Sequence, residues 1–440
     1  MGDENLNILM FTNTYRPIVG GVSESVQRLH EQLERQGHHV LVVAPALEGQ
    51  PEHEPQVFRV PAMQHFNGSD FSVPVLVPSG LHERIREFRP QIIHANHPFL
   101  LGDTAARIAQ TYRLPLVFTH HTLYEHYTHY VPGNSPTMQR FAIALATGFT
   151  DLCDAVIAPS DSIRDLLIER GVTTPLHVVP SGVDTAYFAS GDRQAWRGRL
   201  GLADDVHVFG HVGRLAQEKN LPFLTRAMCC FLTRTENTHF LVVGEGEARK
   251  AMLAHAQQAG VADRVHFTGV LNGQALVDAY RAMDTFVFAS HSETQGMVVA
   301  EAMAAGLPVV ALNASGVREV IENDVNGFLL SKENEELFIA ALERMLDPDV
   351  HRRLGEGSLQ RARLYDQHTC AKRCLDVYQS VLKVHGEPRE DAFDEASTWT
   401  MARSRLEAEW QLLRHRGSVI KDMFSRTPLH SNIKAELSGD

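Results

Sequence analysis

The chain has 440 residues, of which 44% are hydrophobic and 21% are charged, a composition typical of globular proteins. This length exceeds the size at which a single hydrophobic core stops growing, so we expect two domains and an appendage. The formal net charge of -12 argues against nucleic acid binding, because a phosphate backbone requires a basic surface. The 5 cysteines have no metal-ligand spacing, which indicates a reducing compartment and no metal site.

The N-terminus is acidic and leads directly into an apolar stretch, so we expect no signal peptide. No apolar run reaches the roughly 20 residues that a helix needs to span a bilayer. We therefore expect a cytoplasmic protein without a transmembrane segment, in which any membrane contact is peripheral, at the inner face.

The first half of the chain alternates short β-rich runs with amphipathic helical stretches, which indicates a parallel sheet covered on both faces. Gly20 and Gly21 follow the first run, and a helix is expected directly after them. Ser160 is expected to cap a later helix. The strands predicted in this half cover residues 6–12, 40–44, 92–95, 116–119, 155–158 and 178–180.

After Asp184 the alternation of β-rich runs and helical stretches is interrupted, and a second set of alternating elements follows. The strands of this second set are predicted at residues 206–212, 240–243, 265–268, 285–289 and 308–311. We therefore predict two Rossmann-like domains that face a cleft. The predicted parts are an N-terminal domain (1–184), a C-terminal domain (185–365), a helix returning to the first domain (366–385) and a helical tail (386–440). We expect this tail to dock on the body of the protein rather than on a membrane.

The most specific motif is a pair of carboxylates, Glu293 and Glu301, with seven residues between them. Glu293 follows a predicted strand and Glu301 lies in the first turns of the next helix, so both belong to the edge where doubly wound sheets bind ligands. Carboxylates suit a polyhydroxylated ligand because they accept hydrogen bonds from its hydroxyls. The helix N-terminus at Gly296, Met297 and Val298 adds backbone N–H groups for an anion.

Two cations, Arg214 and Lys219, follow the first strand of the second set and could neutralise a diphosphate without a metal ion. Most such pairs are solvated surface charges. Here their position, at the same edge as the two glutamates, favours a shared ligand. Gly20 and Gly21 could likewise admit a phosphate close to the backbone, although a lone Gly-Gly is usually only a turn.

A loop rich in imidazoles and phenols follows the predicted strand 116–119. A single histidine is most often structural, but this cluster suits a site for a hydroxyl nucleophile. The candidate residues in this loop are His121, Tyr124, Glu125, Tyr127 and Tyr130.

Two absences narrow the function. No complete Gly-x-Gly-x-x-Gly follows the first strand, which argues against a dinucleotide-dependent dehydrogenase. Asp347-Pro348-Asp349 lies between late helices rather than after a strand, so we expect no metal-assisted departure of a diphosphate.

Taken together, these motifs, with Pro180-Ser-Gly-Val-Asp184 and Gly244-Glu-Gly246, resemble the retaining GT-B glycosyltransferases of family 4. The resemblance extends from about Leu6 to Val384 and implies a nucleotide-sugar donor. It also implies that residues 1–184 form the acceptor domain and residues 185–365 the donor domain. It implies that Arg214 and Lys219 hold the diphosphate, Glu301 the ribose and Glu293 the sugar hydroxyls. It also implies that Gly21 approaches the distal phosphate and His121 the anomeric carbon.

The loop after His120 and the run 292–298 look like the branch that glucosylates diacylglycerol, although Gln295 stands where many members have an aromatic residue. We therefore expect UDP-glucose as donor, a membrane lipid as acceptor and no metal cofactor. Three alternatives stay open: a soluble or different lipid acceptor, including mannosyl transfer from GDP-mannose, a UDP-sugar 2-epimerase, and a binding module without catalysis.

Overall fold

The computed structural model describes residues 5–18, 20–64, 73–74, 78, 80–125, 135–291, 293–386 and 393. The chain forms two compact units. The first comprises Met1–Pro159, Ile163–Val179 and Arg373–Asp440, and the second comprises Ser160–Ser162 and Pro180–Lys372. The chain thus passes from the first unit to the second at Val179–Pro180, a few residues before the boundary predicted from the sequence.

The first unit is built on a parallel sheet, in which seven strands are found among the described residues, in the order β3-β2-β1-β6-β7-β8-β9. Its strands are β1 (Asn7–Phe11), β2 (His39–Pro45), β3 (Val57–Val60), β6 (Ile92–Ala95), β7 (Leu116–Thr119), β8 (Ala155–Ala158) and β9 (Leu176–Val178). A separate antiparallel pair is formed by β4 (Ala62–Met63) and β5 (Val73–Pro74). The central strands β1, β6, β7 and β8 are buried on both faces, which explains their largely apolar sequences.

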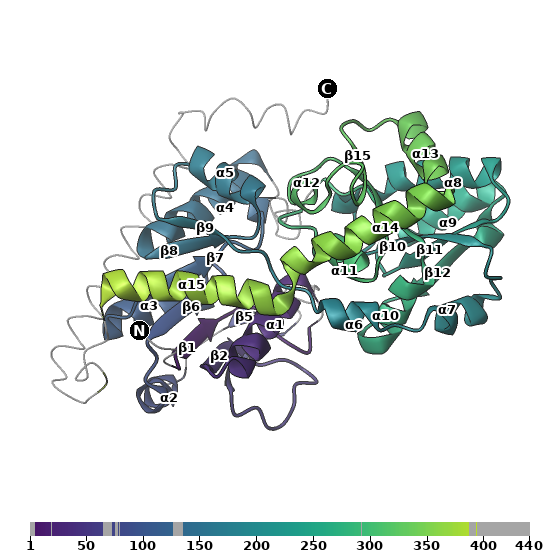
Figure 1. The fold of residues 1–440 in the computed structure, drawn as a ribbon. Helices are drawn as coiled ribbons and strands as arrows, with labels where there is room; N and C mark the ends of the chain where they lie inside the picture. Colours follow the sequence, from purple (N-terminus) through teal and green to yellow (C-terminus); the bar gives the residue numbers. More distant parts are fainter. Residues whose placement is uncertain are drawn as a thin grey trace. The chain divides into compact units, whose positions relative to one another are not determined.

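Helices cover both faces of this first sheet (Figure 1). One face packs against α1 (Gly21–Arg35) and the second part of α15 (Gln367–His385). The other face packs against α2 (Gly80–Phe88), α3 (Leu101–Tyr112), α4 (Pro136–Phe149) and α5 (Asp161–Glu169). Helix α15, predicted as the closing helix, begins in the second unit and ends in the first.

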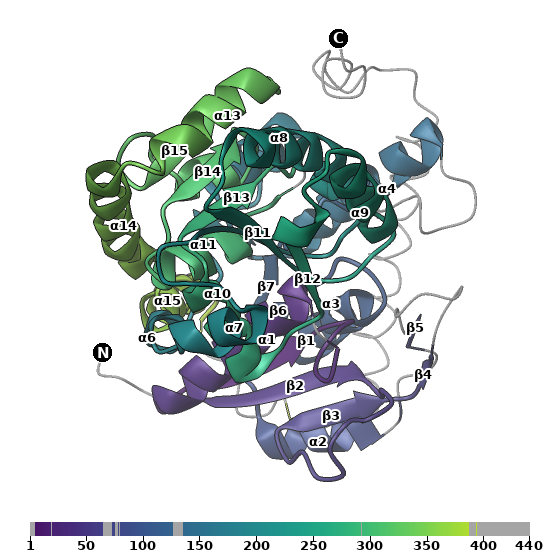
Figure 2. The ribbon, with the colours of Figure 1, turned by 90° about the vertical axis from the view of Figure 1, so that its right-hand side faces the viewer.

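The second unit has a parallel sheet with the order β12-β11-β10-β13-β14-β15 in the described part of the chain. Its strands are β10 (His207–Val212), β11 (Thr238–Val243), β12 (Val265–Gly269), β13 (Thr285–Phe288), β14 (Val309–Leu312) and β15 (Gly327–Leu330). Figure 2 shows α8 (Leu221–Arg234) and α9 (Arg249–Gln258) on one face of the sheet, and α10 (Gly273–Ala282) and α11 (Met297–Ala304) on the other. The remaining helices are α6 (Thr185–Ala189), α7 (Arg193–Leu200), α12 (Val317–Val320), α13 (Glu335–Arg344) and α14 (Pro348–Ala362).

The two Rossmann-like sheets predicted from the sequence are confirmed. The strands that the sequence analysis missed are β3 and β15, each at an edge of its sheet, and the short pair β4 and β5. Of the predicted helical tail, only Gly386 and Phe393 lie within the described residues. Phe393 is 8% exposed and stacks on Tyr112 of the first unit, with the ring centroids 5.4 Å apart.

Candidate active site

In the second unit, β10 and β13 are neighbours at the centre of the sheet, although β11 and β12 separate them in the chain. The crossover connections run in opposite directions from this pair, so the loops after the two strands diverge. Doubly wound sheets bind ligands at such a point. Arg214 and Lys219 lie in the loop after β10, and Glu293 lies in the loop after β13. The predicted cations and one predicted carboxylate therefore occupy the two loops that border this point.

Lys219 and Glu293 meet directly. The Lys219 Nζ lies 2.5 Å from Glu293 Oε1, and the two side chains are only 15% and 14% exposed. A charged pair with so little exposure needs both partners, because either charge alone would lose much of its hydration without compensation. An ammonium has three donors, so Lys219 can bind an anion while it still contacts Glu293.

Arg214 belongs to the same loop but has a different carboxylate partner. Its Nη2 lies 2.5 Å from Oε1 of Glu218, which is 7% exposed, whereas the Arg214 side chain is 48% exposed. The hydroxyl of Ser290, after β13, donates to the Glu218 carbonyl oxygen at 3.3 Å. The loops after β10 and β13 are thus connected a second time, one residue from Lys219.

Glycines bring the loop after β11 against the loop after β10. A Cβ on Gly244 would lie 1.9 Å from the Gly213 carbonyl oxygen, and a Cβ on Gly246 would lie 2.3 Å from that of Leu215. Between them, the Leu215 N–H donates to the Glu245 carbonyl oxygen at 2.8 Å. The Gly244-Glu-Gly246 motif therefore allows close backbone packing that supports the loop carrying Arg214 and Lys219.

Glu301 is a buried carboxylate on α11, 7% exposed. It accepts a hydrogen bond from the Tyr280 hydroxyl at 3.0 Å, which supplies part of the compensation that a buried charge requires. The helix begins after Gly296, whose φ of 74° lies in the left-handed region, and Met297 and Val298 form its first turn. Tyr280, which orients Glu301, was not anticipated from the sequence.

His211 was also missed by the sequence analysis, although it lies on β10 two residues before Gly213. It is fully buried and stacks on Phe288, and its Nδ1 donates to the Val287 carbonyl oxygen at 3.2 Å. Burial lowers the pKa of His211 to about 4. The imidazole is therefore neutral at physiological pH, and it adds no positive charge beneath the cationic loop.

The crossover connections of the first sheet also diverge, between β1 and β6. Such a place, where connections run in opposite directions from two neighbouring strands, is the switch point of the sheet. After β1, helix α1 begins at Gly21, and Gly20 precedes it with a fully extended φ of 179°. A Cβ added to either glycine would meet nothing within 4 Å. Packing within the described protein therefore does not require glycine at these two positions, which leaves room for a ligand to approach the backbone.

His121 is fixed by Asn96, a residue directly after β6 that the sequence analysis missed. The His121 Nε2 lies 2.9 Å from Asn96 Oδ1, and Asn96 Nδ2 donates to the Phe11 carbonyl oxygen at 3.3 Å. Because Nδ2 must face that carbonyl, Oδ1 faces the ring. A carboxamide oxygen only accepts, so Nε2 of His121 carries the proton and Nδ1 carries a lone pair. The rule that ligands bind at the carboxyl ends of strands could have identified Asn96.

The imidazoles around His121 are neutral. Burial, followed by the nearby His97, His94 and His120, holds the pKa of His121 well below its ordinary value. Burial also lowers the pKa of His94 and of His97 to about 3. His94 bridges two buried hydroxyls, with Tyr378 at 2.7 Å from Nδ1 and Thr119 at 2.7 Å from Nε2.

The predicted acceptor residues are only partly described. Tyr124 packs edge-on against Phe99 at 5.0 Å, and burial raises the pKa of its hydroxyl. Glu125 forms an ion pair with Arg170, and both side chains are 13% exposed. Tyr127 and Tyr130 lie outside the described residues.

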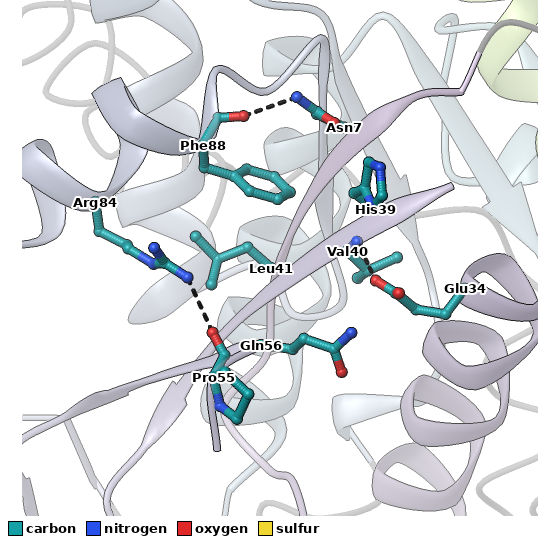
Figure 3. Close-up of a pocket in the computed structure, with 9 residues that line it drawn as sticks. All are labelled: Asn7, Glu34, His39, Val40, Leu41, Pro55, Gln56, Arg84 and Phe88. Atoms are coloured by element: carbon teal, nitrogen blue, oxygen red, sulfur yellow. Dashed lines mark hydrogen bonds between the residues drawn. The ribbon is translucent and has the colours of Figure 1, made fainter. Parts of the chain in front are cut away.

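A pocket of about 330 Å³ opens elsewhere in the first unit (Figure 3). Asn7 and His39, which line it, are the first residues of β1 and β2, so the pocket lies at the amino edge of the sheet. Three of its polar side chains bind main-chain atoms: Asn7 donates to the Phe88 carbonyl oxygen at 2.8 Å, Arg84 donates to that of Pro55 at 2.9 Å, and Glu34 accepts from the Val40 N–H at 2.6 Å. We therefore assign the candidate active site to the carboxyl edges and not to this pocket.

Three further observations bear on the expectations from the sequence. Asp347 caps α14 by accepting hydrogen bonds from the N–H groups of Asp349 and Val350, which explains the Asp-Pro-Asp motif as a helix start. Within the described residues, no group of three or more His, Cys, Asp and Glu side chains could hold a metal ion. No helix in the described part of the chain is both long and apolar enough to cross a membrane.

Comparison with known families gives two adjacent matches. Residues 19–187 match the family described as Glycosyltransferase Family 4, and residues 192–361 match Glycosyl transferases group 1. The structure is similar to that of sucrose-phosphate synthase from Thermosynechococcus elongatus, with a TM-score of 0.70 and 22% identity. The match covers 86% of this chain and 99% of that one. This similarity supports the two-unit GT-B fold alone.

Two relatives illustrate the range of activities in similar sequences. An alpha-monoglucosyldiacylglycerol synthase from Streptococcus pneumoniae is 31% identical over 79% of this chain and 80% of its own length. A GDP-mannose-dependent alpha-mannosyltransferase from Corynebacterium glutamicum is also 31% identical, over 79% of this chain and 82% of its own. Both relatives, and both family matches, are glycosyltransferases.

Proposed function

The chain belongs to glycosyltransferase family 4, and from this premise we propose that it transfers a glucosyl group from UDP-glucose to the hydroxyl of diacylglycerol with retention at the anomeric carbon. The proposal is supported by similarity to alpha-monoglucosyldiacylglycerol synthases, 31% and 27% identical to this chain. It is carried by the contact between Lys219 and Glu293, because this contact joins a phosphate-binding cation and a hydroxyl-binding carboxylate at the switch point of the second sheet.

In the proposed donor site, each group binds the part of the nucleotide sugar that its chemistry suits. Arg214 and Lys219 bind the diphosphate as cations. Glu293 accepts hydrogen bonds from the hexose hydroxyls, and Glu301, oriented by Tyr280, accepts hydrogen bonds from the ribose. The backbone N–H groups at Gly296, Met297 and Val298 add the partial positive charge of the α11 N-terminus.

The first unit supplies the acceptor side. Gly20 and Gly21 admit the distal phosphate close to the backbone. His121 lies beside the anomeric carbon, held by Asn96 as a neutral ring. Tyr124, Glu125, Tyr127 and Tyr130 contribute to acceptor binding.

We propose a front-face reaction. The bond between the anomeric carbon and the diphosphate oxygen breaks, and a bond to the acceptor oxygen forms on the same face of the sugar. The acceptor's proton moves to the departing diphosphate oxygen. Arg214 and Lys219 stabilise the charge that develops on this oxygen, and no metal ion takes part. The neutral imidazole of His121 adds no charge of its own at the reacting carbon.

The experiment that tests this function is a panel of radiolabelled UDP- and GDP-sugars, each with and without diacylglycerol vesicles. We expect a labelled glycolipid from UDP-glucose with vesicles, unchanged by EDTA, and none from Glu293→Ala. Transfer to a soluble acceptor in the absence of vesicles would contradict the lipid assignment. Association of the protein with the vesicles, measured by sedimentation, tests the proposed peripheral contact with the membrane.

Mannosyl transfer from GDP-mannose is the second candidate. It is favoured by one observation, the GDP-mannose-dependent relatives at 31% and 33% identity. The same panel separates the two candidates, because a mannosyltransferase would label its product from GDP-mannose and not from UDP-glucose.

A further inference from the structure

Gln295 lies in the loop between β13 and α11, two residues after Glu293, and is only 3% exposed. Its carboxamide forms two hydrogen bonds with the main chain of one residue, Ser181. The Oε1 accepts from the Ser181 N–H at 2.6 Å, and the Nε2 donates to the Ser181 carbonyl oxygen at 2.8 Å. The side chain therefore connects two segments that are 114 residues apart in the chain.

The orientation of this carboxamide is fixed by its partners. An N–H group can only meet the carboxamide oxygen, and a carbonyl oxygen can only meet the carboxamide nitrogen. Turning the group over would break both hydrogen bonds, so one orientation is much more stable than the other. Of the common side chains, only an amide offers a donor and an acceptor in this geometry without a charge.

Ser181 is the second residue of the segment Pro180–Lys372 and lies where the chain enters the second unit. This entry segment is itself held in place. The Val183 N–H donates to the Tyr365 carbonyl oxygen at 2.8 Å, and the Gln367 N–H donates to that of Val183 at 3.0 Å. A Cβ on Gly182 would lie 2.4 Å from Gln367 Cα, so these two backbones are in close contact. Gln295 is thus bonded to a firmly held part of the unit.

Other contacts hold the rest of the loop. The Ser160 hydroxyl donates to the Thr294 carbonyl oxygen at 2.7 Å. On Gly316, a Cβ would lie 2.6 Å from the Gln295 nitrogen and 2.8 Å from the Glu293 carbonyl oxygen. The backbone at Glu293–Gln295 therefore packs against Gly316. Gln295 adds the one side-chain restraint in this loop, among the described contacts, that uses two hydrogen bonds to the same residue.

We propose that Gln295 is a positioning residue for the donor sugar. By binding Ser181, it sets the place of the Glu293 carboxylate, which contacts the hexose in the proposed function. This inference rests on that function for the identity of the ligand. Binding of the diphosphate and of the ribose depends less on Gln295. Arg214 and Lys219 belong to another loop, and Glu301 is held separately by Tyr280.

The test compares the binding of a nucleotide sugar with that of the nucleotide alone, by calorimetry without an acceptor. The sugar is whichever of UDP-glucose and GDP-mannose the wild-type protein prefers. The variants are Gln295→Met, which removes both hydrogen bonds, and Gln295→Glu, which keeps the acceptor but loses the donor. We expect the binding advantage of the sugar to fall roughly tenfold, since a displaced Glu293 would lose about one hydrogen bond to the hexose and one such bond is worth about that factor. Binding of the nucleotide alone should stay within about twofold.

Gln258→Glu is the matched control, because Gln258 is exposed at the end of α9 and the charge change is the same. It should leave both affinities unchanged. Hydrogen exchange provides a readout that needs no ligand: peptides containing Ser181 should exchange faster in Gln295→Met, since its N–H loses its partner. Intact nucleotide binding confirms that each variant is folded.

Two results would overturn the proposal. One is an unchanged advantage of the sugar in both Gln295 variants. The other is an equal loss of affinity for nucleotide and nucleotide sugar, which would indicate a general structural role. Failure of glucosyl transfer by the wild-type protein would contradict the proposed function alone, because the binding comparison requires no acceptor.

Discussion

The ion pair of Lys219 and Glu293 explains why neither residue could be replaced without effect on the other. Both side chains are largely buried, at 15% and 14% exposure, so loss of the lysine leaves a carboxylate with little solvent to stabilise it. The same lysine is the cation proposed to bind the diphosphate. Because Lys219 both pairs with Glu293 and is proposed to bind the diphosphate, its removal should lower catalysis far more than removal of an ordinary surface charge.

Lys219→Ala is therefore expected to lower kcat/KM by about 100- to 1000-fold, the usual effect of removing a group that stabilises a developing negative charge. Lys250→Ala, an exposed position on α9, is the control and should retain activity. Initial rates over a range of donor concentrations provide the measurement. A loss smaller than about fivefold would contradict the role given to Lys219 in stabilising the leaving group.

Asn96→Asp changes the charge beside His121 while preserving shape. In the wild-type protein the pKa of His121 lies well below its ordinary value, mainly through burial, so the ring is neutral. A carboxylate at the position of Oδ1, 2.9 Å from Nε2 in the wild type, favours the protonated ring and should raise this pKa. NMR titration of the His121 ring protons measures the shift. Asn96→Ala, which adds no charge, should leave the ring neutral, and an equal shift in both variants would refute the argument.

At the scale of elements, the loop between β13 and α11 depends on a glycine from another loop. Gly316 has a φ of 75°, and a Cβ there would lie 2.6–2.8 Å from backbone atoms of Glu293, Thr294 and Gln295. Those atoms cannot turn away as a flexible side chain can. A substitution at Gly316 must therefore move the loop that carries Glu293.

Gly316→Ala is expected to lower the free energy of unfolding by about 1–3 kcal/mol, through an unfavourable φ and the displaced loop. Gly198→Ala is the matched control, since Gly198 lies within α7 and a Cβ there would meet nothing within 4 Å. This control should be neutral or stabilising, by up to about 1 kcal/mol. Urea unfolding of both variants gives the comparison. Equal free energies of unfolding would show that the loop carrying Glu293 can move without loss of stability.

Sequence patterns predicted the central elements better than the peripheral ones. β6, β7 and β8 are largely apolar because both of their faces are buried, and their predicted bounds agree with the structure. β3 and β15 are edge strands with several half-exposed residues, so the apolar signal is interrupted. Short strands of this kind are recognised only from their neighbours in the sheet.

The candidate site divides in the same way. Glu293, Arg214 and Lys219 could be identified because each follows a strand and carries a charge that suits the ligand. Asn96 also follows a strand, but its amide is uncharged, so its sequence position alone did not indicate a ligand-binding role. The partnership of Gln295 with Ser181 could not be predicted at all, since it joins segments 114 residues apart and depends on how the loops pack.

At the scale of the whole molecule, both units bury neutral imidazoles. Burial lowers the pKa to about 3 for His94 and His97, and to about 4 for His120, all in the first unit. In the second unit, burial lowers the pKa of His207 and His211 to about 4. Each of these rings is ordinarily half protonated near pH 6.5, so each takes up a proton more readily in the unfolded chain than in the folded one.

This difference predicts acid sensitivity with a definite sign. Well above pH 6.5 the histidines are neutral in both states and do not affect the pH dependence of stability. As the pH falls from 6.5 towards 4, the unfolded chain binds more protons, so the free energy of unfolding decreases. Each buried histidine contributes up to about 1.4 kcal/mol per pH unit in this range. Urea unfolding at pH 7.5, 6.0 and 5.0 should show the decrease.

His211→Phe tests the origin of this effect. The ring stacks on Phe288 with centroids 5.8 Å apart, so an aromatic replacement fits the surroundings, although it leaves the Val287 carbonyl oxygen without its donor. The variant is expected to be less stable at pH 7.5 and to lose stability less steeply below pH 6.5, because one titrating group is gone. His53→Gln, at an exposed position, should keep the wild-type slope. If both variants kept that slope, His211 would not contribute to the acid sensitivity, and the remaining decrease would have to come from other groups.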